Sequence, residues 1–203
     1  MAQIGKIKIT IKQGNIAAED VDCIMVPEFN DCASYGGVGY AIKNAGMEDG
    51  LCAYTMAVKK NPLATGEEMI TPSGKVGIML AHVATIEANA NEQFYVVTKA
   101  VLQTLISADA LGVKTIAVPE LGTGIIGSLT PEQSAKAIFS ALNHFNTICP
   151  GNAMQELRLV IYGGSTKPAE KVLEEQSYRD AKPEKGQKKF DLIKWVKEIS
   201  EQM

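Results

Sequence analysis

The chain has 203 residues, of which 46% are hydrophobic and 21% charged, a composition typical of one globular domain with a short appendage. No apolar run is long enough to cross a membrane and no apolar signal region follows the N-terminus, so we expect a cytoplasmic protein without a membrane partner. The formal net charge of −3 and the lack of a basic stripe argue against nucleic acid as a partner, so an anionic ligand would need local donors.

Periodicity of the apolar residues predicts the elements in chain order. Alternation over residues 6–12 predicts a half-buried strand, and short apolar runs predict further strands at 21–26, 68–71, 77–83, 115–118 and 157–162. Helical spacing predicts helices at 38–45, 51–60, 94–111, 135–145 and 169–175. Strands come first and then alternate with helices. This order predicts a three-layer α/β/α fold with a mixed central sheet.

The composition changes near Gln176, and residues 178–189 are mostly polar or charged. Apolar residues then recur at helical spacing from Phe190 to Ile199, with Trp195 beside them. We therefore expect a domain over residues 1–175, followed by a charged linker and a terminal amphipathic helix over 176–203. This helix either packs back on the domain or mediates self-association into a homo-oligomer.

The four cysteines, Cys23, Cys32, Cys52 and Cys149, show no C-x-x-C spacing and no paired histidine. This spacing argues against zinc, and disulfides are unusual in reducing cytosol. We expect neither a metal nor a cofactor.

A glycine-rich stretch, Gly122-Thr-Gly-Ile-Ile-Gly127, follows the strand at 115–118 and has the spacing G-x-G-x-x-G. In a dinucleotide-binding fingerprint the glycines open the helix, and an acidic residue about 20 positions on binds the ribose. Here the helix is expected to begin later, with Thr130 as N-cap and Pro131 at its first position. No Asp or Glu occurs between Glu132 and Glu156. The context therefore argues against a nicotinamide site.

A second glycine stretch, Tyr35-Gly-Gly-Val-Gly39, also lies between an apolar strand and a helix. Glycines after a strand let main-chain N–H groups converge, and such a nest binds phosphate without Lys or Arg. Each stretch taken alone is equally compatible with a plain turn. Two such loops at the carboxyl ends of strands face one crevice, which predicts a nucleotide diphosphate ligand.

These segments together resemble a macrodomain. The resemblance is carried by Gln13-Gly-Asn-Ile16, residues 21–25, Gly36-Gly-Val38, residues 66–71, the run from Val118 to Gly127, and Leu159-Val-Ile-Tyr162. It covers roughly residues 5 to 172, in order. It implies a three-layer fold with an ADP-ribose cleft, and it leaves the C-terminal extension outside the family domain.

The resemblance also implies site residues. Gly36, Gly37 and Val38 would line the first loop, near the pyrophosphate and the distal ribose. Asn15, followed by Ile16, stands where many members carry an Asp that accepts a hydrogen bond from the adenine amino group. Tyr162 stands where some relatives stack an aromatic ring on adenine, or else it belongs to the rim of the core. The second loop would wrap the diphosphate with the main chain of Gly122, Thr123, Gly124, Ile125, Ile126 and Gly127.

The chain departs from the pattern of hydrolytic macrodomains. Val26-Pro-Glu-Phe29 stands where those members carry Asn-Ala-Ala-Asn, so Val26 and Phe29 replace two amides and make the distal ribose end more apolar. Gly39 stands where some members have an Asp. Ile126 stands where another subgroup has its catalytic Asp, which acts together with a Lys. None of these familiar catalytic sets is therefore intact.

The remaining candidates for catalysis are Glu120, at the end of a strand, and Asn30, one place beyond Phe29. Glu28 and Asp31 beside the first loop are further candidates, since a desolvated carboxylate can act as a base. The alternative for each carboxylate is a solvated loop position. His82 falls inside an apolar run and is expected to be a core residue.

Three functions remain. The first is a module that binds ADP-ribose or an ADP-ribosylated protein with little or no hydrolysis. The second is an ADP-ribosyl hydrolase, or a phosphatase acting on ADP-ribose 1″-phosphate, that uses Glu120, Glu28 or Asn30. The third is a scaffold that assembles through its C-terminal helix.

Overall fold

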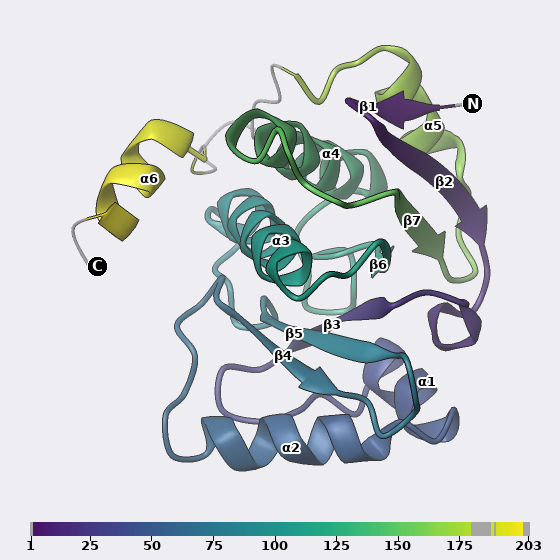
Figure 1. The fold of residues 1–203 in the computed structure, drawn as a ribbon, viewed down its shortest axis with the longest axis vertical. Helices are drawn as coiled ribbons and strands as arrows, with labels where there is room; N and C mark the ends of the chain where they lie inside the picture. The colour runs from purple at the N-terminus through teal and green to yellow at the C-terminus, as the bar shows by residue number, and fades with distance from the viewer. Residues whose placement is uncertain (1, 180–187, 189, 201–203) are drawn as a thin grey trace.

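Seven strands form one mixed sheet in the computed structural model, which describes residues 2–179, 188 and 190–200 (Figure 1). The strands run across the sheet in the order β1-β2-β7-β6-β3-β5-β4. Their bounds are β1 Gln3–Ile4, β2 Ile7–Gln13, β3 Cys23–Glu28, β4 Glu68–Pro72, β5 Met79–Ala84, β6 Thr115–Pro119 and β7 Glu156–Ile161.

The five central strands, from β2 to β5 in this order, are parallel to their neighbours, whereas β1 and β4 pair antiparallel at the two edges. Helices cover both faces of the central strands, which explains why β3 and β6 are continuous apolar runs rather than alternating ones. Because the central strands are parallel, their carboxyl ends meet along one edge of the sheet, where α/β proteins bind ligands.

Helices form a layer on each face of the sheet. On one face α3, α4 and α5 enclose the larger core, and on the other η1, α1 and α2 enclose a second one. The predicted three-layer α/β/α fold with a mixed sheet is confirmed. The helices span η1 Ile16–Ala18, α1 Gly37–Asn44, α2 Glu48–Val58, α3 Gln93–Ala110, α4 Pro131–Ile148, α5 Lys167–Glu174 and α6 Leu192–Ser200.

Local capping accounts for the helix starts. Thr130 caps α4 as predicted: its Oγ1 accepts a hydrogen bond from the N–H of Gln133 at 3.2 Å, and Pro131 is the first helical residue. α2 begins at Glu48 rather than at Leu51, because Glu48 and Asp49 favour the positive end of the helix dipole. The two-residue strand β1 was not predicted, since it is too short to show a period.

The C-terminal helix packs back on the domain, one of the two predicted alternatives. The ring of Phe190, which precedes α6, contacts both α3 and α4: its centroid lies 5.6 Å from that of Tyr95 on α3 and 5.7 Å from that of His144 on α4. Trp195 on α6 is buried and its ring lies 6.0 Å from that of Phe190. Most of the predicted linker, residues 180–187 and 189, lies outside the described residues. No helix in the described ranges has the length and apolarity needed to span a membrane.

Candidate functional site

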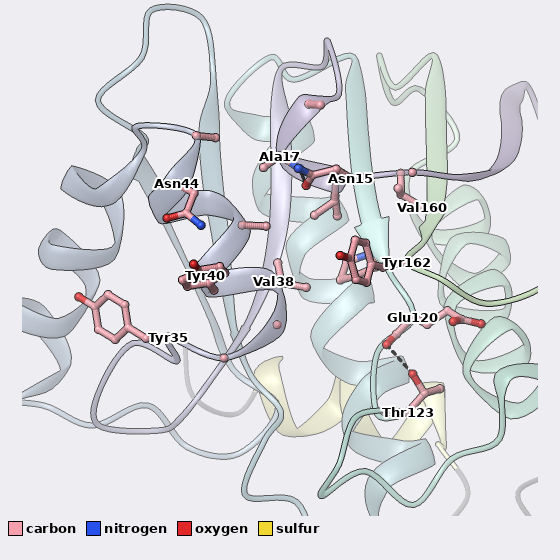
Figure 2. A pocket seen from close by; sticks show the side chains of 18 residues that line it. Asn15, Ala17, Tyr35, Val38, Tyr40, Asn44, Glu120, Thr123, Val160 and Tyr162 are labelled. Carbon is pink, nitrogen blue, oxygen red and sulfur yellow. Dashed lines mark hydrogen bonds between the residues drawn. The ribbon is translucent and has the colours of Figure 1, made fainter.

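A cavity of about 830 Å³ opens at the carboxyl edge of the sheet, where β6 and β7 end (Figure 2). One wall is the segment 14–18 that contains η1, and the opposite wall is the loop and helix α1 over residues 35–45. Its base is formed by Pro119 at the end of β6 with the following Glu120, and by Val160 on β7 with Tyr162 just beyond that strand. Its volume and position are those of a typical small-molecule site in an α/β protein.

The first glycine loop faces this cavity directly. Gly36, Gly37 and Val38 line it, and Gly36 is the N-cap of α1. Gly37 has a φ of +49°, which only glycine adopts without strain. A Cβ at Gly39 would lie 1.6 Å from the carbonyl oxygen of Ser34, so no other residue fits this backbone. An Asp at position 39 is therefore incompatible with this loop, which agrees with its absence from the sequence.

The second glycine loop meets the cavity through one residue, Thr123. Its Oγ1 donates to the main-chain oxygen of Glu120 at 3.1 Å. The N–H groups of Gly127 and Leu129 donate to the carbonyls of Gly124 and Gly122, and these bonds close the loop on itself. Of the predicted members, Gly122, Gly124, Ile125, Ile126 and Gly127 do not line the cavity, and the Ile125 side chain is fully exposed.

The end of the cavity beside η1 carries an amide and an aromatic ring. Asn15 lines the wall, and its Oδ1 accepts a hydrogen bond from the N–H of Ala17 at 3.0 Å, which caps η1. Ile16 also lines the wall, although it is 5% exposed and packs into the second core. Tyr162 is 89% exposed, so it does not belong to the rim of the core. Figure 2 shows the Tyr162 ring below the Asn15 side chain.

The sequence interpretation missed three larger side chains of this wall. Tyr35, Tyr40 and Asn44 all line the cavity from the first loop and α1. Tyr40 and Asn44 are four residues apart, so they share one face of α1. The signal was present, because both tyrosines flank the glycines that were singled out.

Glu120 is the acidic side chain of the cavity, and the lining contains no Lys, Arg or His within the described part of the chain. Burial raises the pKa of Glu120 above the usual range of a carboxyl group. An anion that binds here must therefore rely on main-chain N–H groups and on the amino-terminal end of α1.

The model of the Macro domain family matches residues 30–138, more than half of the chain. The chain belongs to the macrodomain family. A curated relative is the ADP-ribose glycohydrolase of Archaeoglobus fulgidus, 30% identical over 195 residues, which cover 85% of this chain and 95% of the relative. Some relatives are longer. An uncharacterized protein of Thermotoga maritima is 29% identical to this chain, and the match covers 26% of that protein.

Solved macrodomains share the fold. A variant of the Oceanobacillus iheyensis macrodomain, solved with ADPR, has a TM-score of 0.73 at 17% identity, and the match covers 86% of this chain and 96% of that one. A Trypanosoma brucei macrodomain in complex with ADP-ribose has a TM-score of 0.65 at 19% identity, covering 81% and 68% of the two chains. At these identities the likeness establishes the architecture of the macrodomain.

Asn30 and Phe29 lie outside the cavity lining of this macrodomain. The Nδ2 of Asn30 donates to Thr65 Oγ1 at 3.1 Å, and the main-chain carbonyl of Asn30 accepts from the N–H of Leu63 at 2.9 Å. Phe29 is half-buried, and its carbonyl accepts from the hydroxyl of Tyr54 at 2.6 Å. These contacts give Asn30 a structural role in holding the loop at 63–65.

Glu28 is fully buried, so the expectation of a solvated loop carboxylate is wrong for this residue. Its Oε1 lies 2.9 Å from Nδ1 of His82, which is fully buried in β5 and confirms the prediction of a core histidine. Burial raises the pKa of Glu28 to about 8, against a smaller opposing effect of the hydrogen bond from the N–H of Ser34. Burial lowers the pKa of His82 to about 3. The raised pKa of Glu28 and the lowered pKa of His82 both favour the uncharged form of the side chain.

The cysteines are all unpaired, and Cys23 is buried within β3. Burial is the largest cause that raises the pKa of Cys23 to about 12, so its thiol is inert at neutral pH. In the described part of the chain no three His, Cys, Asp or Glu side chains gather as metal ligands would.

Proposed function

We propose that this macrodomain binds ADP-ribose, or a related nucleotide diphosphate, in the cavity between η1 and α1, and that it hydrolyses this ligand weakly or not at all. The observation that supports the proposal most strongly is the cavity of about 830 Å³ with the first glycine loop exposed along its wall. One structurally similar macrodomain was solved with ADPR and another in complex with ADP-ribose.

Main-chain donors would hold the diphosphate. The N–H groups of Gly37 and Val38 lie in the first turn of α1, where they have no partner within the helix and where the helix dipole favours an anion. Across the cavity, Thr123 is the residue of the second loop that lines the wall, and its N–H group makes no main-chain hydrogen bond within the part of the chain that the structure describes. We propose that this N–H group binds the second phosphate.

The two nucleoside ends would use different chemistry. Tyr162 offers an exposed ring for a base to stack on, and Asn15 offers an amide at the base edge. An ionised Glu120 would repel the phosphates, but its oxygens can accept hydrogen bonds from ribose hydroxyl groups. We therefore assign Glu120 to ribose recognition in the binding module.

Calorimetry with ADP-ribose tests the binding, with two glycine variants for comparison. Gly37→Ala places a side chain at a φ of +49° in the first loop, and Gly112→Ala does so at +79° after α3, and neither added Cβ meets another atom. The empty loop of Gly37→Ala would relieve this strain by leaving its conformation, and the ligand would have to restore it, so a strain of about 1 kcal/mol predicts a roughly fivefold loss of affinity. Gly112→Ala carries the same kind of strain far from the cavity and should bind normally. Absence of both heat and a thermal shift at millimolar ligand would rule the function out.

A second candidate is ADP-ribosyl hydrolysis or the removal of phosphate from ADP-ribose 1″-phosphate. It is favoured by the Archaeoglobus fulgidus relative, which is named a glycohydrolase, and by the raised pKa of Glu120, which suits a general acid or base. In the same samples, release of ADP-ribose from a modified protein, or of phosphate from ADP-ribose 1″-phosphate, should fall at least a hundredfold in Glu120→Gln if Glu120 carries the reaction. Undiminished turnover would exclude Glu120.

A further inference from the structure

Two ionisable side chains lie directly behind the first glycine loop and take no part in the proposed binding. Glu28 is the last residue of β3 and His82 belongs to β5, and both are fully buried. Glu28 Oε1 and His82 Nδ1 are 2.9 Å apart. A buried acid and a buried imidazole are costly to fold, so their contacts are informative.

The imidazole is fixed on its other sides as well. His82 Nε2 lies 2.8 Å from the hydroxyl of Thr71 on β4, and this hydroxyl donates to the carbonyl of Gly50 on α2 at 3.4 Å. The ring of Tyr54 stacks on the imidazole with centroids 4.5 Å apart and planes inclined by 10°. The Tyr54 hydroxyl then donates to the carbonyl of Phe29. The pair is thus held by α2, β4 and β5 together.

The other carboxyl oxygen of Glu28 reaches the glycine loop. Oε2 accepts a hydrogen bond from the N–H of Ser34, two residues before Gly36. The carbonyl of Ser34 in turn packs against the α-carbon of Gly39, and Gly39 N–H donates to Gly36 O at 3.1 Å. Glu28 therefore fixes the point from which the loop enters α1, and this stretch lines the cavity.

The hydrogen bonds of the network are all satisfied when both side chains are neutral. A protonated Glu28 donates to Nδ1 of His82, the Nε2–H group donates to Thr71, and Thr71 donates to Gly50. A proton moved from Glu28 to His82 leaves the pair uncharged overall as well. Loss of that proton leaves one buried negative charge beside the loop.

The surroundings offer little to offset such a charge. His82 faces Glu28 from β5, and Tyr54, which faces the network from α2, has a pKa raised first by burial and then by Glu28, Cys32, Asp31 and Glu87. These four come from β3, from the loop that follows it and from the segment after β5. Apart from Glu28 itself and the thiol of Cys32, they are the carboxyl groups of Asp31 and Glu87, so a negative charge on the pair would face acidic neighbours.

We propose that Glu28 is a positioning residue for the first glycine loop, which holds an anionic ligand most tightly while the Glu28–His82 pair is uncharged as a whole. This inference rests on the proposed function, because it takes the ligand to be a diphosphate. It makes ligand affinity dependent on a group that the ligand does not touch.

The expected pH dependence follows from the two side chains. The pKa of His82 is lowered to about 3 and that of Glu28 is raised to about 8, so the pair stays uncharged between these values. Above pH 8 the carboxylate forms behind Ser34 and repels the diphosphate. Affinity for ADP-ribose should then fall at least fivefold between pH 7 and pH 9.

Two substitutions separate positioning from charge. In Glu28→Gln the amide donates to His82 Nδ1 and accepts from Ser34, but it cannot ionise. This variant should bind ADP-ribose within twofold of the wild type at pH 7 and should lose the decline at pH 9. In Glu28→Leu both hydrogen bonds are lost, so affinity and the protection of the Ser34 amide against hydrogen exchange should each fall at least tenfold at pH 7.

Glu120→Gln is the matched control, because it neutralises a second carboxyl group with a raised pKa, inside the cavity rather than behind it. It should keep the decline between pH 7 and pH 9. The inference is overturned if Glu28→Gln declines as the wild type does, or if Glu28→Leu retains normal affinity and Ser34 protection. If Glu28→Leu does not fold, the pH profiles of the wild type and Glu28→Gln decide. If the wild type binds no ADP-ribose, the proposed function fails, while Ser34 exchange still tests the positioning.

Discussion

At the scale of single residues, the amide of Asn15 has an orientation that its surroundings fix. Its Oδ1 accepts a hydrogen bond from Ala17 N–H, and only the oxygen of an amide can accept from an N–H group. The Nδ2 group, which carries two donors, is the part left for a ligand. An Asp at this position would instead offer a second acceptor. With Asn15 rather than Asp, this wall therefore presents hydrogen-bond donors to the edge of a base, where an Asp would present acceptors.

We predict that this wall favours a carbonyl over an amino group at position 6 of a purine. Inosine diphosphate should bind at least as tightly as ADP, and Asn15→Asp should reverse the order to favour ADP about fivefold, the effect of one hydrogen bond of ~1 kcal/mol. Titration of both nucleotides measures the ratio. Asn143→Asp adds the same charge on α4 outside the cavity lining and should leave the ratio unchanged. A wild type that already prefers ADP as strongly as Asn15→Asp would contradict the prediction.

The helix cap at Thr130 and the Glu28–His82 pair show which contacts can be predicted from the sequence. Thr130 and Pro131 were correctly predicted because a cap depends on neighbours within four residues. Glu28 was misjudged because its partner His82 is 54 positions away, and only the pairing of β3 with β5 brings the two together. Desolvation by tertiary contacts leaves no local signal in the sequence.

At the scale of elements, the sequence predicted the same phosphate-binding role for the two glycine loops, but the loops differ in the structure. The first ends in the opening turn of α1, so Gly36 and Gly37 face the cavity. The second continues past Gly127 before α4 begins, and its internal hydrogen bonds turn Gly124, Ile125 and Ile126 outward. The spacing of glycines predicts that the main chain of a loop can adopt unusual conformations. The position of the next helix decides whether that main chain faces the cavity.

The helix α6 presents two faces with different properties. Trp195 is buried against Phe190 and belongs to the same hydrophobic cluster as α3 and α4, whereas Ile193 is 70% and Val196 44% exposed. The division into a domain over 1–175 and an extension over 176–203 stays a proposal. Self-association through α6 also stays a proposal, since the exposed apolar face of this helix is small. Both depend on how firmly Trp195 is docked.

Trp195 is the single tryptophan of the chain, so its fluorescence reports the docking of α6 directly. We expect blue-shifted emission from the folded protein. Phe190→Ala removes a ring that touches Tyr95, His144 and Trp195, and it should shift the emission to the red with little change in the circular dichroism of the domain. Ile193→Ala changes only the exposed face and serves as the control. Emission that stays blue-shifted in Phe190→Ala would contradict docking through Phe190, and a dimer in solution that Ile193→Ala dissociates would show that α6 is held by self-association instead.

At the scale of the whole molecule, the class of fold followed from the order of strands and helices, whereas the order of strands in the sheet did not. β7 inserts between β2 and β6, which joins residues about 148 positions apart, such as Lys8 and Glu156. Periodicity reports which segments are strands, but the pairing of the strands depends on packing across the whole chain. The same limit applies to the site, because its walls come from η1, α1 and the ends of β6 and β7.

A charged network ties the first long strand to the last one and predicts how the stability of the molecule depends on pH. Glu156 on β7 accepts from Thr10 Oγ1 at 2.6 Å and pairs with Lys8 at 2.8 Å and Arg158 at 3.1 Å. Burial alone would raise the pKa of Glu156, but these hydrogen bonds outweigh it and lower the pKa to about 2. Because the folded pKa lies below the unfolded one, the network stabilises the fold fully above pH 4.5, and this contribution is lost as the pH falls towards 2.

Glu156→Gln should therefore be less stable than the wild type at pH 7, by on the order of 2–3 kcal/mol, and the difference should vanish near pH 2. Urea unfolding at a series of pH values measures this gap, with Glu132→Gln, which breaks the more exposed pair with Lys136, as a control expected to cost under ~1 kcal/mol. The buried His82 also destabilises the acid form, but it does so equally in both proteins, so it cancels in the comparison. A gap of constant size between pH 6 and pH 2.5 would mean that the side-chain packing of Glu156, rather than its charge, joins β2 to β7.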